Sequence, residues 1–128
     1  MPETEEVKKD ERCVTGIDEL DVMLGGGIPT GSTVLVTGSS GSGKTTLCMQ
    51  FLINGAKKGE RGVFFTITEP LFKLTKNMEG FDFYDKKLIE TGMVNLIDLR
   101  IIIERLGLDT EKYTVEDASA LLDILRDI

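Results

Sequence analysis

The chain has 128 residues, 41% of them hydrophobic and 29% charged, and a formal net charge of -7. This length and composition suit one soluble domain with its own core, and no apolar run approaches the roughly 18 residues of a membrane span. The acidic balance disfavours direct binding to the phosphates of DNA or RNA. The absence of histidine excludes His-activated nucleophiles and His-ligated zinc.

The N-terminal stretch is charged and lacks apolar periodicity, so we expect residues 1–12 to form a flexible acidic arm before a domain over residues 13–128. This stretch is too polar for a signal peptide. Neither cysteine has a metal-ligand spacing, which favours a reducing, cytoplasmic location. Apolar residues at helical spacing predict a helix from Ile17 to Leu24, ended by Gly25–Gly27.

The central motif of the chain is a phosphate-binding loop. A short apolar run, Val34–Val36, predicts a buried strand, and a helix is predicted from Lys44 to Lys58. Between strand and helix, Gly38, Gly43, Lys44 and Thr45 satisfy the pattern G-x-x-x-x-G-K-[ST], known as Walker A. An incidental Gly/Ser loop is the alternative, but the strand before and the helix after are the context that this motif requires.

The residue types of the motif explain its chemistry. Glycines allow backbone angles that turn the loop N–H groups toward an anion, at the positive end of the following helix. Lys44 supplies a mobile charge for the outer phosphates, and the Thr45 hydroxyl can bind Mg²⁺. The predicted nucleotide-binding residues are Gly38, Ser39, Ser40, Gly41, Ser42, Gly43, Lys44, Thr45 and Thr46.

The rest of the chain alternates helices and strands. The predicted 44–58 helix has an apolar face, and a second buried strand is predicted at 63–67, which together with Val34–Val36 gives a β-α-β unit and a parallel sheet. The apolar face consists of Leu47, Cys48, Phe51, Leu52 and Gly55. Further helices are predicted at 71–78, 85–90 and 114–128 and a third strand at 93–97, while 99–113 fits no single element.

Two acids follow predicted strands, where open parallel sheets bind ligands. Glu69 could orient or deprotonate a water aimed at a terminal phosphate, or it could be an acid that simply favours a helix start. Asp98 resembles the Walker B carboxylate that holds Mg²⁺, but a solvated acid at a strand end is the alternative that we favour. No Asn/Thr-Lys-x-Asp run is present, which favours adenine over guanine.

Residues 15–66, TGIDELDVMLGGGIPTGSTVLVTGSSGSGKTTLCMQFLINGAKKGERGVFFT, resemble the start of a KaiC-like domain of the RecA superfamily. The resemblance implies a RecA-like α/β fold with a mainly parallel sheet flanked by helices. It also implies ATP and Mg²⁺ as ligands, and a homo-oligomer (ring, filament or dimer) with nucleotide between subunits. In such a domain Lys44 and Glu69 would be catalytic residues, and Thr45 would bind the Mg²⁺ ion.

Two departures from the family pattern qualify this expectation. Members often carry two adjacent glutamates after the second strand, whereas this chain has Thr68-Glu69. The family's Walker B strand would follow the 114–128 helix, so residues 13–128 are expected to be the N-terminal part of a domain. ATP hydrolysis is expected of the complete domain. A nucleotide-binding regulatory or assembly module without turnover, or an accessory protein of DNA recombination and repair, is the alternative.

Overall fold

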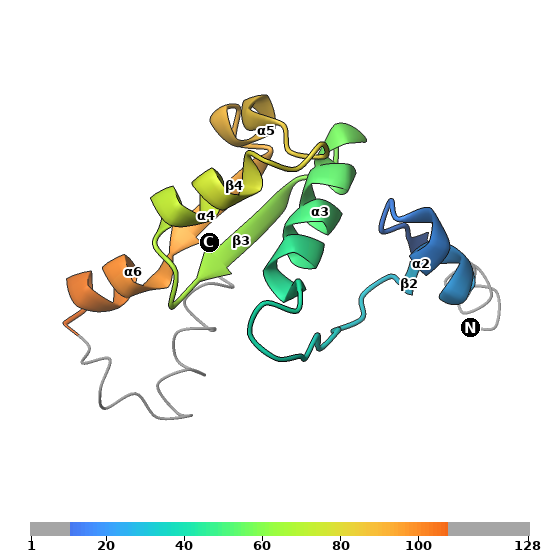
Figure 1. The fold of residues 1–128 in the computed structure, drawn as a ribbon, viewed down its shortest axis with the longest axis horizontal. Coiled ribbons are helices and arrows are strands. Elements are labelled where there is room, and N and C mark those ends of the chain that lie inside the picture. The colour runs from blue at the N-terminus through green and yellow to red at the C-terminus, as the bar shows by residue number, and fades with distance from the viewer. Residues whose placement is uncertain (1–10, 108–128) are drawn as a thin grey trace, which may run out of the picture.

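The computed structural model describes residues 11–107 (Figure 1). In chain order the elements are β1 (Arg12–Cys13), α2 (Asp18–Met23), β2 (Ile28–Pro29), α3 (Lys44–Lys57), β3 (Gly62–Thr66), α4 (Leu71–Met78), α5 (Lys86–Glu90), β4 (Val94–Asp98) and α6 (Leu99–Arg105). Within this part of the chain no helix is long and apolar enough to cross a membrane.

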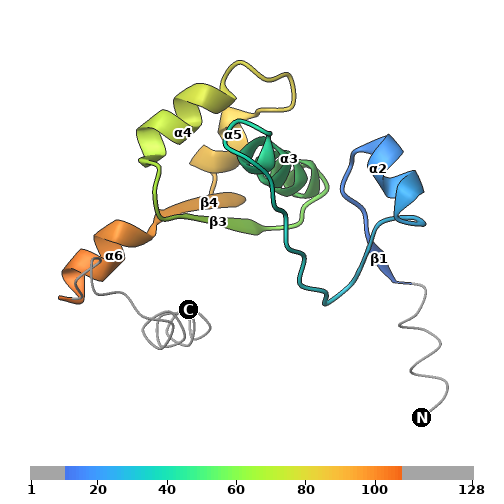
Figure 2. The ribbon, with the colours of Figure 1, turned by 60° about the horizontal axis from the view of Figure 1, so that its bottom comes forward.

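The centre of the fold is the parallel pair β3–β4. Its register runs from Gly62 opposite Val94 to Thr66 opposite Asp98. The helices α3, α4 and α5 lie together on one side of this pair (Figure 2). The other side carries Val63 and Phe65, which are exposed among the described residues. The pair is therefore covered on one face only by the described part of the chain.

The core lies between the strand pair and the helices that cover it. Its fully buried side chains come from three elements: Met49, Ile53 and Ala56 of α3, Leu74 and Met78 of α4, and Val94 of β4. Burying one large apolar side chain contributes about 1.5–3 kcal/mol. Helix α3 is therefore packed into the core through its middle and C-terminal turns, and its first residue, Lys44, belongs to the predicted loop.

An N-terminal segment is attached to α3 by polar contacts. Asp21 of α2 accepts hydrogen bonds from the backbone N–H and the hydroxyl of Thr15, at 2.9 and 2.7 Å. The carbonyl of Thr15 in turn accepts a 3.1 Å bond from Asn54 Nδ2 of α3. The strands β1 and β2 pair antiparallel in this segment, with Arg12 opposite Pro29. Arg12 of the predicted arm thus belongs to a strand, and residues 1–10 lie outside the described residues.

The prediction of a strand at Val34–Val36 is wrong for the described structure. The segment is extended but forms no ladder, and Leu35 is 85% exposed. A strand needs a neighbour for its backbone groups, and β3 pairs only with β4 among the described residues. The parallel sheet is confirmed, but it consists of β3 and β4 and does not include the segment before the loop.

The prediction for the buried face of α3 is also wrong. The core uses Met49, Ile53 and Ala56. Four residues of the predicted face line an open groove of about 850 Å³ between α3, β3 and the 32–36 segment: Leu47, Cys48, Phe51 and Leu52. The helix has two apolar faces. The spacing of apolar residues in the sequence predicts burial of the broader face, whereas the core contacts the other one. Leu47, Phe51 and Phe65 are among the groove residues.

The predicted elements that follow β3 mostly agree with the structure. The helices at 71–78 and 85–90 and the strand at 93–97 are confirmed within a residue at each end. Part of the unassigned stretch forms α6, which begins directly after β4. The predicted helix 114–128 lies outside the described residues.

Candidate nucleotide site

The predicted loop, Gly38–Thr45, connects the extended 34–36 segment to the start of α3. Gly43 is the residue before the helix and has φ of 98°, and Gly41 has φ of 80°. Residues other than glycine rarely adopt backbone angles in this left-handed region. The backbone N–H of Ser42 donates to the carbonyl of Ser39 at 3.2 Å, which closes a turn inside the loop. The loop therefore has the tight, glycine-dependent conformation that the motif predicts.

The first turn of α3 is electrostatically open to an anion. No side chain caps it in the described structure, and it contains no acid. By contrast, α2 carries Asp18, Glu19 and Asp21 in its first turn. The sequence has no Asp or Glu from Val22 through Gly59. The partial positive charge of the α3 N-terminus is thus not neutralised locally.

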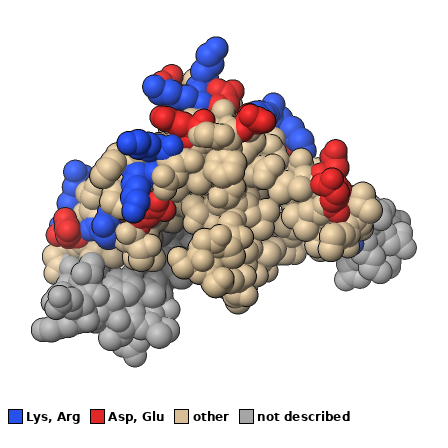
Figure 3. Space-filling model, in the orientation of Figure 1, with Lys and Arg blue, Asp and Glu red and all other residues tan. Residues whose placement is uncertain are grey.

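The surface agrees with this local balance. On the face shown in Figure 3, acidic and basic side chains gather along the upper and lateral parts, over the helices far from the loop. The lower central surface, where Figure 1 places the loop, carries neither colour. On this face, in a chain of net charge -7, no carboxylate that would repel a phosphate is visible over the loop.

Lys44 lies over the loop. Its Nζ donates to the carbonyl oxygens of Gly38 and Ser39, at 2.7 and 3.0 Å. These bonds fold the side chain back onto the loop, so that the ammonium group lies on the same side as the loop backbone. Because an ammonium group has three donors, the arrangement leaves one for a phosphate oxygen without breaking either bond.

Thr45 and Thr46 follow in the first turn of α3 and are half-buried. Mg²⁺ prefers hard oxygen ligands and is commonly held by one or two protein groups together with water and substrate phosphates. Among the described residues no cluster of three or more acidic or cysteine side chains could hold a metal by itself. A Mg²⁺ ion at the Thr45 hydroxyl would take its remaining ligands from water and from a nucleotide.

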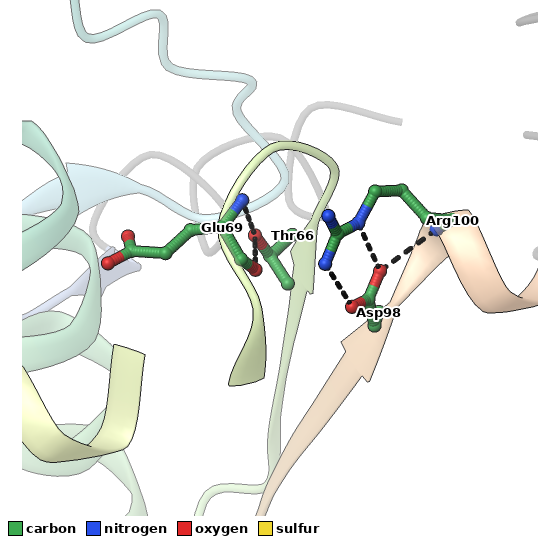
Figure 4. Close-up of polar contacts among 4 residues, drawn as sticks. All are labelled: Thr66, Glu69, Asp98 and Arg100. Carbon is green, nitrogen blue, oxygen red and sulfur yellow. Dashed lines mark hydrogen bonds and ion pairs between the residues drawn. The ribbon is translucent and has the colours of Figure 1, made fainter. Parts of the chain in front are cut away.

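Glu69 lies three residues after the end of β3, in the bend that leads to Pro70 and α4. Figure 1 shows the carboxyl ends of β3 and β4 on the same, lower side of the molecule as the loop. The Glu69 carboxylate accepts a 3.1 Å hydrogen bond from Asn77 Nδ2. Figure 4 shows it pointing away from Asp98 and Arg100. Glu69 therefore lies at the end of the sheet at which the sequence places it.

Asp98 is neither solvated nor free to bind a metal. It is buried, and its Oδ1 accepts from the backbone N–H and the Nε of Arg100, at 3.0 and 3.2 Å, while Oδ2 accepts from Nη2 at 2.8 Å (Figure 4). The hydrogen bonds from the Arg100 side chain hold the pKa of Asp98 below its ordinary value, against the effect of desolvation. The preferred prediction of a solvated acid is wrong: Asp98 is the N-cap of α6.

Three residues at this end of the sheet were missed by the sequence reasoning: Thr66, Asn77 and Arg100. Arg100 could have been found, because an Asp two residues before an Arg at a strand end is a plausible cap and ion pair. Asn77 lies eight residues from its partner Glu69, a spacing that no local pattern identifies. Thr66 reads as an ordinary β-branched strand residue.

Comparison with known proteins places the chain in a family. The family model "ATPase: KaiC" matches residues 13–128. A UPF0273 protein of Methanopyrus kandleri is 39% identical over 119 residues, which cover 91% of this chain and 47% of the relative. The circadian clock protein KaiC3 of Synechocystis is 46% identical over 71 residues, covering 56% of this chain and 14% of that protein.

A solved structure of a KaiC-like protein is similar to this fold, in agreement with the family match. The KaiC-like protein of Pyrococcus horikoshii superposes with a TM-score of 0.63 at 36% identity, over 77% of this chain and 50% of that one. The chain thus spans about half the length of the UPF0273 relative and of this structural neighbour. The predicted α/β fold with a parallel sheet is confirmed, and because the family model covers nearly the whole chain, the protein belongs to the KaiC ATPase family.

Proposed function

We propose that the chain binds ATP with Mg²⁺ through residues 38–46 and forms the phosphate-binding part of a RecA/KaiC-like ATPase. One observation carries the proposal. The uncapped, acid-free start of α3 is preceded by a glycine-dependent loop, with Lys44 Nζ bonded to the carbonyl oxygens of Gly38 and Ser39. Loop amides, helix N-terminus and ammonium group then act together on one polyanion.

In the proposed reaction a water oxygen attacks the terminal phosphorus of ATP, and the bond from that phosphorus to the bridging oxygen breaks, giving ADP and phosphate. Lys44 and the loop amides stabilise charge that develops on the phosphate oxygens. Glu69 orients the water and accepts its proton. Thr45 holds the Mg²⁺ ion, which when bound neutralises phosphate charge.

Isothermal calorimetry with Mg-ATP and Mg-ADP tests the binding step. Lys44→Ala should weaken binding at least about tenfold, because a charge-assisted hydrogen bond contributes about 1.5–3 kcal/mol. Lys58→Ala is the matched control, since it removes the same charge just beyond the other end of α3 and should leave the affinity unchanged. Binding that is absent in the folded wild type, or equal in both variants, contradicts the proposal.

The second candidate function is a nucleotide-binding regulatory or assembly module without turnover. Two observations favour it: Thr68 precedes Glu69, where the family resemblance implies that a second glutamate is often present, and the Asp98 carboxylate is bonded to Arg100. Phosphate release by wild type and Glu69→Gln separates the two functions. Release that requires Glu69 supports the ATPase, whereas binding without release supports the second candidate.

The setting of the protein is also a proposal. We place it in the cytoplasm, as a homo-oligomer (ring, filament or dimer) that binds ATP or ADP and has no direct contact with DNA or a membrane through this segment. The relatives named as clock proteins support a signalling role over one accessory to DNA repair. Light scattering with and without Mg-ATP tests the assembly.

A further inference from the structure

We infer that Thr66 and Asn77 are positioning residues for Glu69, one fixing its backbone and the other its carboxylate. The inference rests on the proposed hydrolysis, in which Glu69 contacts the attacking water. It adds two residues, one from β3 and one from α4, that touch neither nucleotide nor water and act only through Glu69.

The backbone of Glu69 is held by one buried hydroxyl. Thr66 is the last residue of β3 and is only 7% exposed. Its Oγ1 accepts from the Glu69 backbone N–H at 3.2 Å and donates to the Glu69 carbonyl at 2.8 Å (Figure 4). A single side chain thus satisfies both polar groups of the Glu69 backbone. The bend after β3 therefore has a fixed geometry relative to the sheet.

The Thr66 hydroxyl is itself rigidly placed. Thr66 is the register partner of Asp98, and Asp98 is fixed by its bonds to Arg100. A β-branched residue in a strand has a restricted χ1, so the hydroxyl has little freedom. The position of the Glu69 backbone is therefore determined by the end of the sheet and not by the exposed bend.

The carboxylate of Glu69 is held from the last turn of α4. Asn77 Nδ2 donates to Oε1 at 3.1 Å, across eight positions of sequence. This bond occupies one of about four lone-pair sites on the two carboxylate oxygens. Oε2 accepts no bond from the described residues, so it is the oxygen that can take the proton of a water. Asn77 therefore selects one orientation of the carboxylate and leaves the other oxygen for chemistry.

Catalysis by a positioned acid or base depends on this kind of control. A general base contributes about 10²–10⁴-fold, and a misplacement of about 1 Å can cost about 10²-fold. Losing either positioning residue should therefore reduce turnover by about tenfold or more while leaving nucleotide affinity unchanged. Affinity depends on the loop, which neither residue contacts.

The test uses the full-length protein with Thr66→Val, Thr66→Ser and Asn77→Ala. The Val variant keeps the shape and removes the hydroxyl, and the Ser variant restores it. Thr75→Val is the matched control, because the Thr75 hydroxyl bonds only to carbonyls within α4. The kcat of steady-state phosphate release should be lower than that of wild type in Thr66→Val and Asn77→Ala. It should return toward the wild-type value in Thr66→Ser and stay unchanged in Thr75→Val.

Combination with Glu69→Gln shows whether the two residues act through Glu69. The losses should disappear in the Glu69→Gln background, since a base that is already removed cannot be misplaced. Losses that persist there, or a kcat unaffected by Thr66→Val and Asn77→Ala when Glu69→Gln abolishes it, overturn the inference.

A spectroscopic readout separates failure of the inference from failure of the proposed ATPase. In ¹⁵N-correlated NMR spectra, Glu69→Gln should shift the side-chain amide signal of Asn77, and Thr66→Val should remove the exchange protection of the Glu69 amide. If these changes occur in a chain that binds ATP without releasing phosphate, the hydrolytic proposal fails and the positioning geometry stands. If both signals are unaffected, the inference fails whatever the activity.

Discussion

Thr66 and Asp98 are register partners at the last position of the β3–β4 pair, and each is hydrogen-bonded to a residue a short way beyond its own strand. The Thr66 hydroxyl bonds to the backbone of Glu69, and the Asp98 carboxylate bonds to the backbone and side chain of Arg100. The sheet therefore ends in two buried polar groups that fix the two exits from it. This end of the sheet lies on the same side as the loop (Figure 1).

The first prediction concerns the pH dependence of stability. Hydrogen bonds from Arg100 lower the pKa of Asp98 in the folded protein, so its stabilising contribution is present above the unfolded pKa of about 3.9 and is lost as pH falls through the folded value. Asp98→Asn should therefore lower the free energy of unfolding at pH 7, and the gap to wild type should narrow below about pH 4. Urea unfolding followed by circular dichroism between pH 2 and 7 measures it.

Asp21→Asn serves as a comparison in the same titration. The hydroxyl of Thr15 lowers the pKa of Asp21. Asp21→Asn should therefore also lower the free energy of unfolding at pH 7, and its difference from wild type should also narrow at acid pH. The two sites share no partner, so the double variant should be additive. If the difference in unfolding free energy between wild type and either Asn variant does not change with pH, the lowered pKa does not stabilise the fold at that residue.

The second prediction concerns the backbone of the loop. A Cβ at Gly43 would meet nothing within 4 Å among the described residues, so we expect Gly43→Ala to act through the φ of 98°. We expect a destabilisation of about 1–2 kcal/mol and loss of nucleotide binding. Gly80→Ala is the control, because Gly80 also has open space but no positive φ. Thermal unfolding should separate the two variants, and equal midpoints would show that the loop does not need the left-handed conformation.

The third prediction concerns the attachment of α3. Ile53 is 0% exposed, whereas Ile67 is 57% exposed. Ile53→Ala should lower the free energy of unfolding by about 2–5 kcal/mol, since it leaves a cavity beneath the helix. Ile67→Ala, the same change outside the core, should cost no more than about 0.5 kcal/mol. Denaturant midpoints measure both, and comparable losses would place the core elsewhere.

The fourth prediction concerns the contact between the N-terminal segment and α3. A Cβ at Gly16 would lie 2.5 Å from Nδ2 of Asn54, whereas one at Gly25 would meet no atom of residues 11–107 within 4 Å, although both glycines have positive φ. Gly16→Ala should therefore destabilise more than Gly25→Ala. Asn54→Ala should relieve part of the excess in the Gly16→Ala background. A double-mutant cycle by thermal unfolding tests this, and additive losses contradict the contact.

The loop and most helices could be predicted because their signals are local. The spacing of Gly38, Gly43 and Lys44 is a sequence pattern, and Asp85 is an N-cap whose carboxylate accepts from the N–H of Lys87. The confirmed strand β4 is a compact apolar run bounded by Gly92 and Asp98.

What could not be predicted depends on contacts distant in sequence. Whether Val34–Val36 forms a strand depends on a neighbouring strand, and the residues themselves cannot specify one. Which face of α3 is buried depends on the positions of Leu74 and Val94, because the helix is apolar on two sides. The state of Asp98 depends on a hydrogen bond from a side chain of a helix that the pattern left unassigned.

The extended segment before the loop has a consequence for motion. Within the described residues, no group accepts a hydrogen bond from the amides of Val34–Val36, whereas residues 44–57 form the continuous helix α3. Deuterium should therefore enter the amides of this segment orders of magnitude faster than those at the centre of α3. The loop is thus anchored on its helical side only, and a bound polyphosphate would slow exchange upstream of Gly38 by ordering the free side.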